Sequence, residues 1–413
     1  MKRRVLIICY YFPPLGLAGV TRPLQLFRRL AKHDYECHVL TIKPVAYYAY
    51  EPELLSELDQ SRIHRSGSSD PQRLMYLCGV RRVPGRSTGT ARRLRSSIFP
   101  DSKRGWIGPA VRLGLKLNRE QKYDLLLSTS PPISAHVVAL RLAARTGVKW
   151  VADFRDLWST QSIEDTYSNA SMVRRGRRLL GDLKSVAASV TAVNGSIAEY
   201  LGTSNVITNG FDPDHAKLWN ASPDSDRFII GLLGTFNDQL PIEPLLNCLA
   251  ALREKNASSF QRVRLLQIGR VDKDWLVKQL DKYNLTDCCD IRGLQSRART
   301  VELLSAASLF YLGMQHGWED RITPARVYDL LASGRPILAY TRPGSELSLP
   351  VAKMTVSMTF TETNASEATE FIGKLAAKHA CGELLFEPVP EYARPYSWDN
   401  VAAQFAALFD RIL

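Results

Sequence analysis

Carboxylates and an arginine lie together in the middle of the sequence, where they could do acid–base chemistry. Asp153, Arg155 and Asp156 follow directly on an apolar, strand-like segment. Asp156 could act as general base for a hydroxyl group, with Arg155 as its charge partner and Asp153 as a further catalytic candidate. A buried Asp–Arg pair that only fixes the loop would use the same residue types, and the sequence leaves both interpretations open.

A glycine-containing turn near the N-terminus could bind an anion. The segment 11–22 contains Gly16 and Gly19 and joins an expected strand to an expected helix. Glycines let the backbone approach an anion closely, and free N–H groups at a helix start can hold it. The segment lacks the GxGxxG spacing, which argues against a dinucleotide. A tight turn without any ligand is the alternative.

The scaffold that must position these residues is predicted by an alternation of strand-like and helix-like segments. In the first half we expect strands at 4–9, 37–42, 125–128, 149–153, 189–193 and 206–208, and helices at 22–33 and 134–146. In the second half we expect strands at 228–233, 263–268, 308–312 and 336–340, and helices at 242–254, 275–283 and 324–333.

This alternation predicts an α/β protein of two doubly wound, Rossmann-like domains. We expect an N-terminal domain over 1–208, a linker rich in Gly, Pro, Asp, Asn and Ser over 209–227, a C-terminal domain over 228–390 and a terminal helical segment over 391–413. Open α/β sheets bind ligands at the carboxyl ends of their strands. A ligand in a cleft between the two domains is therefore the default expectation.

The charge is strongly basic and unevenly placed. The formal net charge is +13, and the stretch 81–119 holds eleven Lys/Arg but one acidic residue, Asp101. A second basic cluster lies at 174–178. Such patches attract nucleic acid, anionic lipid or phosphorylated substrates, although a solvated surface has the same composition. Trp106, inside the first patch, could enter a membrane interface or pack on the core. The chain lacks a recognisable nucleic-acid recognition module, so we expect no nucleic-acid partner.

Other residue types exclude several classes of protein. No apolar run reaches the length of about 18 residues that spans a bilayer. The seven cysteines are scattered without a CxxC, which supports neither a disulfide framework nor a zinc site and fits a reducing cytoplasm. His136 lies on an apolar helix, where a packed histidine is more common than a catalyst.

An ordered set of motifs resembles the bacterial glycosyltransferase family 4, in particular a branch of surface polysaccharide assembly. The N-terminal motifs are Phe12-Pro13-Pro14 with Gly16 and Gly19, Ser130-Pro131-Pro132, the stretch 153–158 and Thr208-Asn209-Gly210-Phe211-Asp212. The C-terminal motifs are the stretch 231–235, Gln267-Ile268-Gly269, Arg292-Gly293, the long stretch 323–337 and Tyr396-Ser397-Trp398-Asp399. The resemblance covers nearly the whole chain.

The resemblance implies a GT-B fold in which the C-terminal domain holds a sugar nucleotide and the N-terminal domain holds the acceptor. Sugar transfer would be retaining and independent of metals and other cofactors. Donor-binding residues would include Gly16, Gly19, Gly234, Thr235, Arg270, Thr323, Arg326 and Asp329. Arg326 would stabilise the diphosphate leaving group, and Asp329 would accept hydrogen bonds from the ribose.

The sequence departs from the family pattern at the first glutamate of the E-x7-E motif. Arg321 occupies that place, and the neighbouring Glu319 and Asp320 could substitute for the glutamate. The usual Arg and Lys after Gly234 are also not recognisable. We expect a cytoplasmic retaining glycosyltransferase, peripheral on the inner face of the membrane, that acts on a sugar, lipid-linked or other hydroxyl acceptor. The alternatives are an epimerase or hydrolase of the same fold, or a non-catalytic sugar-nucleotide-binding member.

Overall fold

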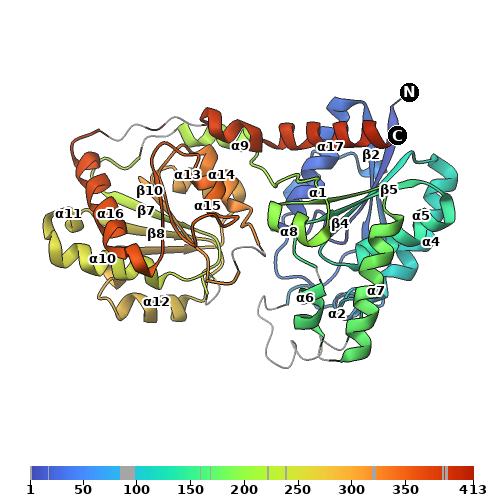
Figure 1. The fold of residues 1–413 in the computed structure, drawn as a ribbon, viewed down its shortest axis with the longest axis horizontal. Coiled ribbons are helices and arrows are strands. Elements are labelled where there is room, and N and C mark those ends of the chain that lie inside the picture. Colours follow the sequence, from blue (N-terminus) through green and yellow to red (C-terminus); the bar gives the residue numbers. More distant parts are fainter. Residues whose placement is uncertain are drawn as a thin grey trace. The chain divides into compact units, whose positions relative to one another are not determined.

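The computed structural model divides the chain into two compact units. Unit 1 comprises residues 1–208 and 401–413, and unit 2 comprises residues 209–400. The structure describes the whole chain except residues 1, 17, 84–97, 159, 168, 221–222, 238–239, 319–321, 384–385 and 387–388. Each unit holds one six-stranded sheet with helices packed on it (Figure 1).

The sheet of unit 1 has the strand order β3-β2-β1-β4-β5-β6, and its strands are parallel. The strands are β1 (Arg3–Ile8), β2 (Tyr35–Ile42), β3 (Ile63–Ser66), β4 (Leu125–Ser130), β5 (Lys149–Phe154) and β6 (Ser189–Ala192). Helices cover both faces of such a sheet, which is why its central strands are almost continuously apolar. Val5 to Ile8 in β1 and Leu125 to Leu127 in β4 are accordingly buried.

The helices of unit 1 connect these strands and close its core. They are α1 (Ala18–Arg29), α2 (Pro71–Leu77), α4 (Arg104–Gln121), α5 (Ser134–Thr146), α6 (Thr160–Thr166), α7 (Ala170–Val186) and α8 (Gly195–Leu201). Helix α17 (Trp398–Ile412) starts in unit 2, and from Val401 onward it belongs to unit 1. There the ring of Phe409 packs edge-on against Tyr35 of β2.

The sheet of unit 2 repeats this architecture with the order β12-β11-β10-β7-β8-β9, again parallel. Its strands are β7 (Phe228–Leu233), β8 (Val263–Ile268), β9 (Cys289–Gly293), β10 (Leu309–Gly313), β11 (Ile337–Tyr340) and β12 (Ser357–Phe360). Its helices are α9 (Pro213–Ala216), α10 (Glu243–Lys255), α11 (Ala257–Gln261), α12 (Lys273–Asp281), α13 (Arg297–Leu304), α14 (Arg326–Ala332), α15 (Ser348–Val351) and α16 (Ala365–Ala380). Strand order reverses between β7 and β10, the place where such sheets bind ligands.

The strongly patterned elements agree with the sequence predictions, and the differences have physical reasons. Strands β7 and β8 and helix α5 have the predicted bounds. The edge strands β3, β9 and β12 were missed because they are short and only partly buried. Helix α1 begins four residues before the predicted start at Arg22. The segment 206–208 forms only an isolated bridge instead of the expected strand.

The segment predicted as a linker is part of unit 2. It contains α9, and both Phe211 and Trp219 are buried in a core cluster that also includes Ile229 and Phe310. The Trp219 and Phe310 rings meet edge-on at 5.7 Å between centroids. Its Gly, Pro and Asp content reflects turns and helix caps, such as the Asp212 cap of α9, and not a free connection.

Of the two positions that the sequence left open for Trp106, the structure shows packing on the core and not entry into a membrane interface. Trp106 is completely buried in α4, and its indole Nε1 donates to Ser66 Oγ at 2.7 Å. Helix α4 packs against α5, where a Cβ on Gly114 would lie 2.6 Å from Leu142 Cδ1. Much of the basic stretch 81–119, namely residues 84–97, lies outside the described residues. Among the described helices, none combines the length and the hydropathy that a bilayer-spanning segment requires.

Candidate functional site

In unit 1, the predicted catalytic Asp153 is the centre of a closed ion-pair network. Arg22 donates to it from Nε at 2.9 Å and Nη2 at 2.8 Å, and the hydroxyls of Thr129 and Thr191 donate at 2.7 and 2.8 Å. Neither Asp153 nor Arg22 has more than 1% of its side chain exposed. Asp153 therefore holds β5, β4, β6 and α1 together, and it has no surface on which to meet a substrate.

The remaining donors of Arg22 complete this network. Arg22 Nη1 donates to the carbonyl oxygen of Thr208 at 2.6 Å, and Nη2 donates to that of Ile207 at 2.8 Å. Its guanidinium also lies 5.1 Å from the ring centroid of Phe405 in α17. Burial opposes ionisation of Asp153, but the charge and hydrogen bonds of Arg22 outweigh it and lower the pKa of the carboxyl. We call this group the Arg22–Asp153 lock.

Arg155 fixes the two loops that the sequence singled out in unit 1. Its side chain is buried and donates to the carbonyl oxygens of Ser130 (2.9 Å), Gly19 (2.8 Å) and Pro131 (3.0 Å). Asp156 follows as an exposed side chain at the carboxyl end of β5. The surrounding protein mass raises the pKa of Asp156, and the charge of Arg155 opposes that shift. The structure thus separates a positioning arginine from an accessible carboxylate.

The glycine turn of unit 1 does not have the surroundings of an anion site. A Cβ on Gly16 would come within 2.3 Å of the carboxylate of Glu51, so an acidic side chain lies against that glycine. Gly19 packs on the ring of Tyr11 and gives its carbonyl to Arg155. A carboxylate beside Gly16 disfavours a diphosphate at that glycine, and the assignment of Gly16 and Gly19 to donor binding stays a prediction.

In unit 2, two glycines bring the ends of β7 and β8 into close contact. Gly234 and Gly269 have φ values of 102° and 124°, which L-residues with a side chain rarely adopt. A Cβ on Gly269 would lie 2.6 Å from Gly234 Cα, so only glycine fits there. The buried Gln267 donates from Nε2 to the carbonyl oxygens of Gly269 at 3.1 Å and Gly234 at 3.5 Å. Thr235 is half-buried beside them.

Arg326, the first residue of α14, lies against this pair of glycines with unused hydrogen-bond donors. A Cβ on Gly234 would be 2.4 Å from Arg326 Nη1, and the guanidinium carbon is 5.9 Å from the ring centroid of Phe236. The Nε and Nη2 atoms are buried and have no hydrogen-bond partner within the described part of the chain. Burial lowers the pKa of Arg326 to about 10, so the group stays cationic at neutral pH. We call this place the Arg326 niche.

Asp329 lies one turn further along α14, where it forms an ion pair that the sequence did not predict. Its Oδ1 accepts from Arg297 Nη2 at 3.1 Å, and both side chains are 28% exposed. Burial raises the pKa of Asp329, while Arg297 opposes the shift. His215 Nδ1 is 3.6 Å from Asp212 Oδ2 in the same neighbourhood. No sequence signal pairs Arg297 with Asp329, because 32 residues separate them.

The other predicted donor residues have varied surroundings. Thr323 is buried, whereas Arg270 is exposed after Gly269. Glu319 and Asp320, together with Arg321, lie outside the described residues.

His136, in unit 1, is completely buried and contacts Ser128 Oγ at 2.7 Å, and burial lowers its pKa to about 3. Within the described part of the chain, no group of three or more His, Cys, Asp or Glu could hold a metal ion.

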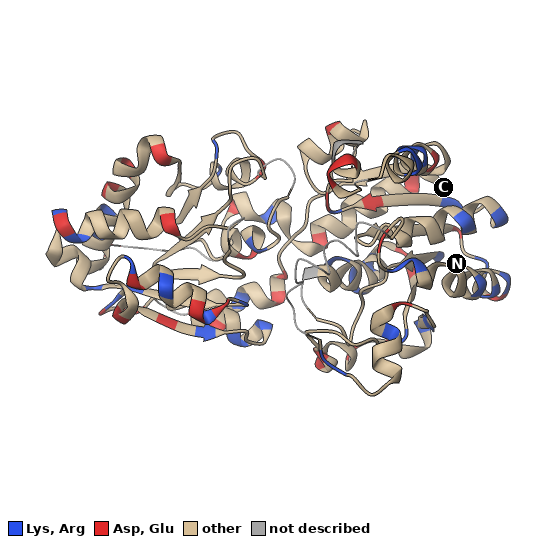
Figure 2. Ribbon diagram, turned by 90° about the horizontal axis from the view of Figure 1, so that it is seen from below, with Lys and Arg blue, Asp and Glu red and all other residues tan. Residues whose placement is uncertain are grey.

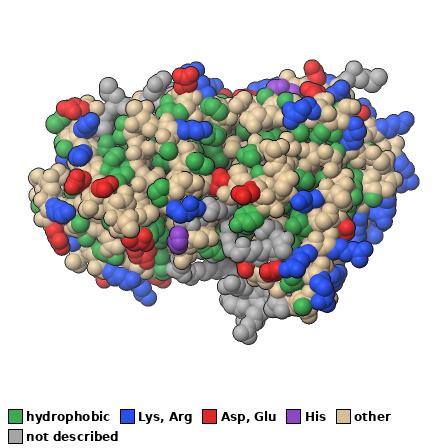
Figure 3. Space-filling model, in the orientation of Figure 1, with side chains coloured by type: hydrophobic (Ala, Val, Ile, Leu, Met, Phe, Trp, Pro, Cys, Tyr) green, Lys and Arg blue, Asp and Glu red, His purple; other side chains and the backbone are tan. Residues whose placement is uncertain are grey.

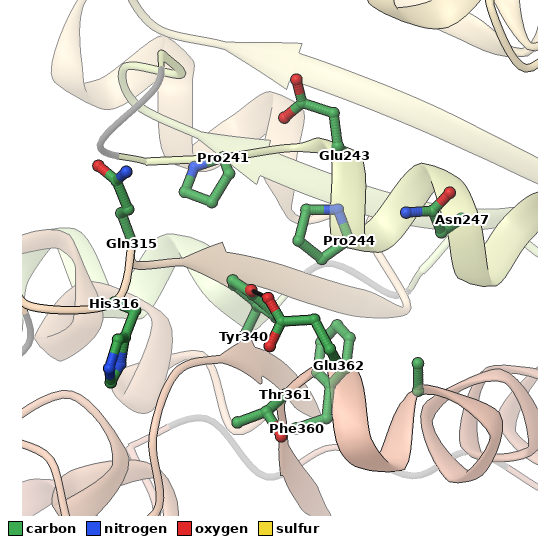
Figure 4. A pocket seen from close by; sticks show the side chains of 11 residues that line it. Pro241, Glu243, Pro244, Asn247, Gln315, His316, Tyr340, Phe360, Thr361 and Glu362 are labelled. Carbon is green, nitrogen blue, oxygen red and sulfur yellow. Dashed lines mark hydrogen bonds between the residues drawn. The ribbon is translucent and has the colours of Figure 1, made fainter.

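A pocket of about 720 Å³ opens at the carboxyl ends of β10, β11 and β12 (Figure 4). The rings of Pro241 and Pro244 lie on one side of it and those of Tyr340 and Phe360 on the other. The hydroxyl of Tyr340 donates to the carboxylate of Glu362. The other lining residues are Glu243, Asn247, Gln315, His316, Thr361 and Ala365, so the described lining contains no lysine or arginine.

A chain of contacts connects this pocket with the Arg326 niche. Phe236 lies beneath Arg326 and stacks on Tyr311 with ring centroids 6.5 Å apart. The hydroxyl of Tyr311 donates to the carbonyl oxygen of Pro241, a pocket residue, at 2.9 Å. Unit 2 therefore offers a cationic niche and a neutral-to-acidic pocket side by side at the carboxyl edge of its sheet.

Comparisons with solved structures identify the fold. The chain matches sucrose-phosphate synthase from Thermosynechococcus elongatus with a TM-score of 0.66 at 15% identity, over 100% of this chain and 99% of that chain. It matches HepE from Anabaena, in complex with UDP, with a TM-score of 0.64 at 13% identity over 100% of both chains. It matches WaaG, a glycosyltransferase involved in lipopolysaccharide biosynthesis, with a TM-score of 0.57 at 12% identity over 98% of this chain and 99% of that chain.

These matches cover both units, so the predicted α/β class of two doubly wound sheets and the GT-B fold are confirmed. No protein-family model matches the sequence. No curated protein matches it either.

Proposed function

We propose that this protein is a retaining glycosyltransferase that moves a sugar from a nucleotide-diphosphate donor to a hydroxyl acceptor. The acceptor would belong to bacterial surface polysaccharide or glycolipid biosynthesis at the inner face of the membrane. The observation that carries the proposal is the Arg326 niche, because two buried guanidinium nitrogens there have no hydrogen-bond partner among the described residues. Buried charged groups are ordinarily paired, so an unpaired one at a sheet edge is best explained by an anionic ligand.

A diphosphate fits the chemistry of this niche. Arginine binds phosphate oxygens through a planar fork of donors, and a positioned cation stabilises the charge that develops on a diphosphate leaving group. The close approach of Gly234 and Gly269 leaves the backbone open to a phosphate. Asp329 has an oxygen not bonded to Arg297 that can accept from ribose hydroxyls. The neighbouring pocket, without cations, suits the hydroxyl-bearing sugar.

On the acceptor side, Asp156 is the candidate general base. It is exposed, and its raised pKa brings its basicity closer to that required of a proton acceptor. Asp153 takes no part, because the Arg22–Asp153 lock uses it structurally. The reaction would need no metal, since Arg326 supplies the positive charge at the leaving group. HepE was solved with UDP and with UDP-glucose, so uridine nucleotides are the first donors to test.

The test is a thermal-shift screen of the purified protein against UDP-, GDP-, dTDP- and ADP-sugars, with NAD and short DNA as controls. Binding to the native state raises the apparent melting temperature. We expect a shift with one class of sugar nucleotide, and its loss in Arg326→Gln. Arg299→Gln is the matched control, because Arg299 is an exposed arginine of unit 2 that forms an ion pair with the exposed Glu302. If no sugar nucleotide raised the apparent melting temperature, the proposal would be overturned.

Activity then separates the proposal from its alternatives. Incubation with the donor identified by the screen should release nucleoside diphosphate only when a hydroxyl acceptor is present. Release without acceptor would indicate a hydrolase, and conversion of the donor sugar to its epimer would indicate an epimerase. Binding without any turnover, over a panel of polyprenyl-linked saccharides, would indicate a non-catalytic member.

A further inference from the structure

Unit 2 mixes acidic and basic side chains, and several of its ion pairs are local. Residues 209–400 contain 21 Lys/Arg and 24 Asp/Glu, whereas residues 1–208 contain 32 and 16. Both charges accordingly recur along the ribbon of unit 2 in Figure 2 and over its surface in Figure 3. Local pairs join residues two or three positions apart, as in Arg227–Asp224, Arg292–Asp290 and Arg299–Glu302. Arg297 differs, because it reaches from the start of α13 to Asp329 on α14, 32 positions away.

Arg297 occupies one oxygen of the Asp329 carboxylate and leaves the other available. Oδ1 accepts from Arg297 Nη2 at 3.1 Å, and no donor among the described residues bonds to Oδ2. Both side chains are 28% exposed, so a ligand can reach the remaining oxygen from solvent. The terminal torsion of an aspartate is broad and roughly two-fold. An ion pair to one oxygen therefore fixes the direction in which the other oxygen points.

The same ion pair keeps Asp329 ionised. Burial raises the pKa of this carboxyl and Asp212 adds to the shift, whereas the charges of Arg297 and His215 oppose it. His215 lies beside Asp212, with Nδ1 3.6 Å from Oδ2. Burial and then Arg297 lower the pKa of His215, against the charges of Asp212, Asp329 and Asp214. Arg297 is therefore the permanent cation of this group, and its loss would raise the pKa of Asp329 further. An ionised carboxylate is an acceptor only, which is the form that hydroxyl donors require.

Asp329 and Arg326 lie on one face of α14, at a spacing that suits one nucleotide. Residues three apart on a helix are neighbours on its surface, about 4.5 Å apart along the axis. In a nucleoside diphosphate, a single methylene group separates the ribose ring from the oxygen of the α-phosphate. A diphosphate bound in the Arg326 niche would thus bring the ribose hydroxyls within reach of Asp329 Oδ2.

We propose that Arg297 is a positioning residue, which holds Asp329 ionised and directed at the ribose and so makes the site selective for ribonucleotides over 2′-deoxyribonucleotides. The 2′ and 3′ hydroxyls of ribose would both donate to the carboxylate. A 2′-deoxyribose lacks one of these donors and loses a hydrogen bond to a charged acceptor. The inference rests on the proposed function, because it names the nucleotide class that the proposed donor site accepts, and it excludes dTDP-sugars as donors.

Isothermal titration of the full chain tests the selectivity. UDP, GDP and ADP are each compared with their 2′-deoxy counterparts, and dTDP is included. For the nucleotide that binds, we expect the ribose form to bind about tenfold tighter than the deoxyribose form. Arg297→Gln should reduce this ratio to about threefold or less, whereas Arg297→Lys, which retains the cation, should keep most of it. Arg299→Gln, two residues further along α13, is the matched control and should keep the ratio of the parent.

The pH dependence of binding separates positioning from a merely structural role. In the parent, affinity should fall in acid as Asp329 becomes protonated. In Arg297→Gln the fall should begin at a higher pH, because loss of the cation raises the pKa of Asp329. Asp329→Asn should lack this component of the fall. The terminal phosphate of the nucleotide also titrates, so each variant is compared with the parent at the same pH.

Several results would overturn the inference and leave the proposed function standing. These are equal affinity of the parent for the ribose and deoxyribose forms, binding of dTDP alone, and a ratio or a pH profile in Arg297→Gln that equals that of the parent. If no nucleotide bound at all, the proposed function would fail and this inference with it. Urea unfolding shows that each variant is folded, and the partly exposed ion pair should contribute little to stability.

Discussion

Near the carboxyl edge of each sheet lies an arginine with buried guanidinium nitrogens, and the two arginines differ in what surrounds them. In unit 1, Arg22 donates to both oxygens of Asp153 and to two carbonyl groups. In unit 2, Arg326 Nε and Nη2 are buried, and no described residue forms a hydrogen bond with them. The same doubly wound architecture therefore holds one arginine in a closed network and keeps the other open to an anion.

Because the two units share one architecture, this difference shows how a structural arginine can be told from a ligand-binding arginine. A fully paired buried charge has no capacity left for a ligand, so it contributes to the free energy of unfolding. An unpaired buried charge costs desolvation in the free protein, and that cost is recovered when an anion binds. The two roles are distinguished by whether the buried donors of the arginine have hydrogen-bond partners, more than by the residue type or its position in a motif.

The largest expected effect is on stability, and it should fall on unit 1 alone. Arg22→Met leaves the Asp153 carboxylate buried without its cation, and we expect a loss of about 3–5 kcal/mol in the free energy of unfolding. Arg326→Met removes a cation that has no partner for two of its nitrogens, and we expect the free energy of unfolding to stay the same or to rise. Urea unfolding of both variants, compared at unchanged m-value, measures the contrast.

Equal destabilisation by the two substitutions would break the comparison, because Arg326 would then be a structural residue. The unfolding of each unit is followed separately if the transitions do not coincide, since a single free energy is defined only for a two-state transition. Arg299→Met, an exposed position, sets the baseline for loss of a charge without loss of a buried partner.

The periodic pattern of the sequence was enough to predict two doubly wound α/β domains, because buried parallel strands such as β7 and β8 are short apolar runs between turns. The GT-B fold was predicted from the resemblance of the motifs. It could not predict the lock, since Arg22 and Asp153 are 131 residues apart and a motif shows no pairing across that distance. Arg326 was predicted from its place in the motif, yet the absence of partners for its nitrogens depends on tertiary packing. The sequence left two positions open for Trp106, because an aromatic residue in an arginine-rich stretch has the same local composition whether it faces lipid or the core.

The second prediction is that the contributions of Asp153 and Asp329 to stability depend on pH in opposite directions. The folded pKa of Asp153 lies below its unfolded value, so its contribution is present above the unfolded value of about 4 and is lost as the pH falls through the folded pKa. The stability difference between the parent and Asp153→Asn, about 3–5 kcal/mol at neutral pH because Asn leaves Arg22 buried without its anion, should therefore shrink in acid.

For Asp329 the dependence of stability on pH should have the opposite sign. Its folded pKa is raised, so the folded state binds more protons and the parent loses stability as the pH rises from about 4 through the folded pKa. The stability of Asp329→Asn relative to that of the parent should consequently increase between acid and neutral pH. Chemical unfolding at a series of pH values measures both curves. Parallel curves for the two variants would show that Asp153 and Asp329 have the same kind of environment.

The third prediction asks whether Gly234 keeps the Arg326 niche open. Gly234→Ala places a methyl group on Arg326 Nη1 at a residue with φ of 102°, and we expect a loss of about 1–2 kcal/mol in stability. Displacement of the guanidinium should also weaken UDP binding roughly tenfold, which is the value of a charge-assisted hydrogen bond. Isothermal titration with UDP measures the affinity.

Gly293→Ala is the control for this variant. Gly293 also has a positive φ, 65°, but a Cβ there would meet no atom within 4 Å. The Gly293→Ala variant should lose a similar amount of stability and keep its affinity for UDP. If Gly234→Ala also kept its affinity, the contact between Gly234 and Arg326 would have no part in binding the nucleotide.

The smallest expected effect separates the two neighbouring sites within unit 2. The pocket beside Asn247 contains hydrogen-bonding groups without a cation, so it should recognise the sugar and not the diphosphate. Loss of one neutral hydrogen bond corresponds to about 1 kcal/mol, so Asn247→Ala should weaken UDP-glucose binding about fivefold and leave UDP binding unchanged. Arg326→Gln should weaken both ligands alike. If Asn247→Ala weakened UDP and UDP-glucose equally, the pocket would act on the nucleotide, and the division of unit 2 into a cationic niche and a sugar pocket would be wrong.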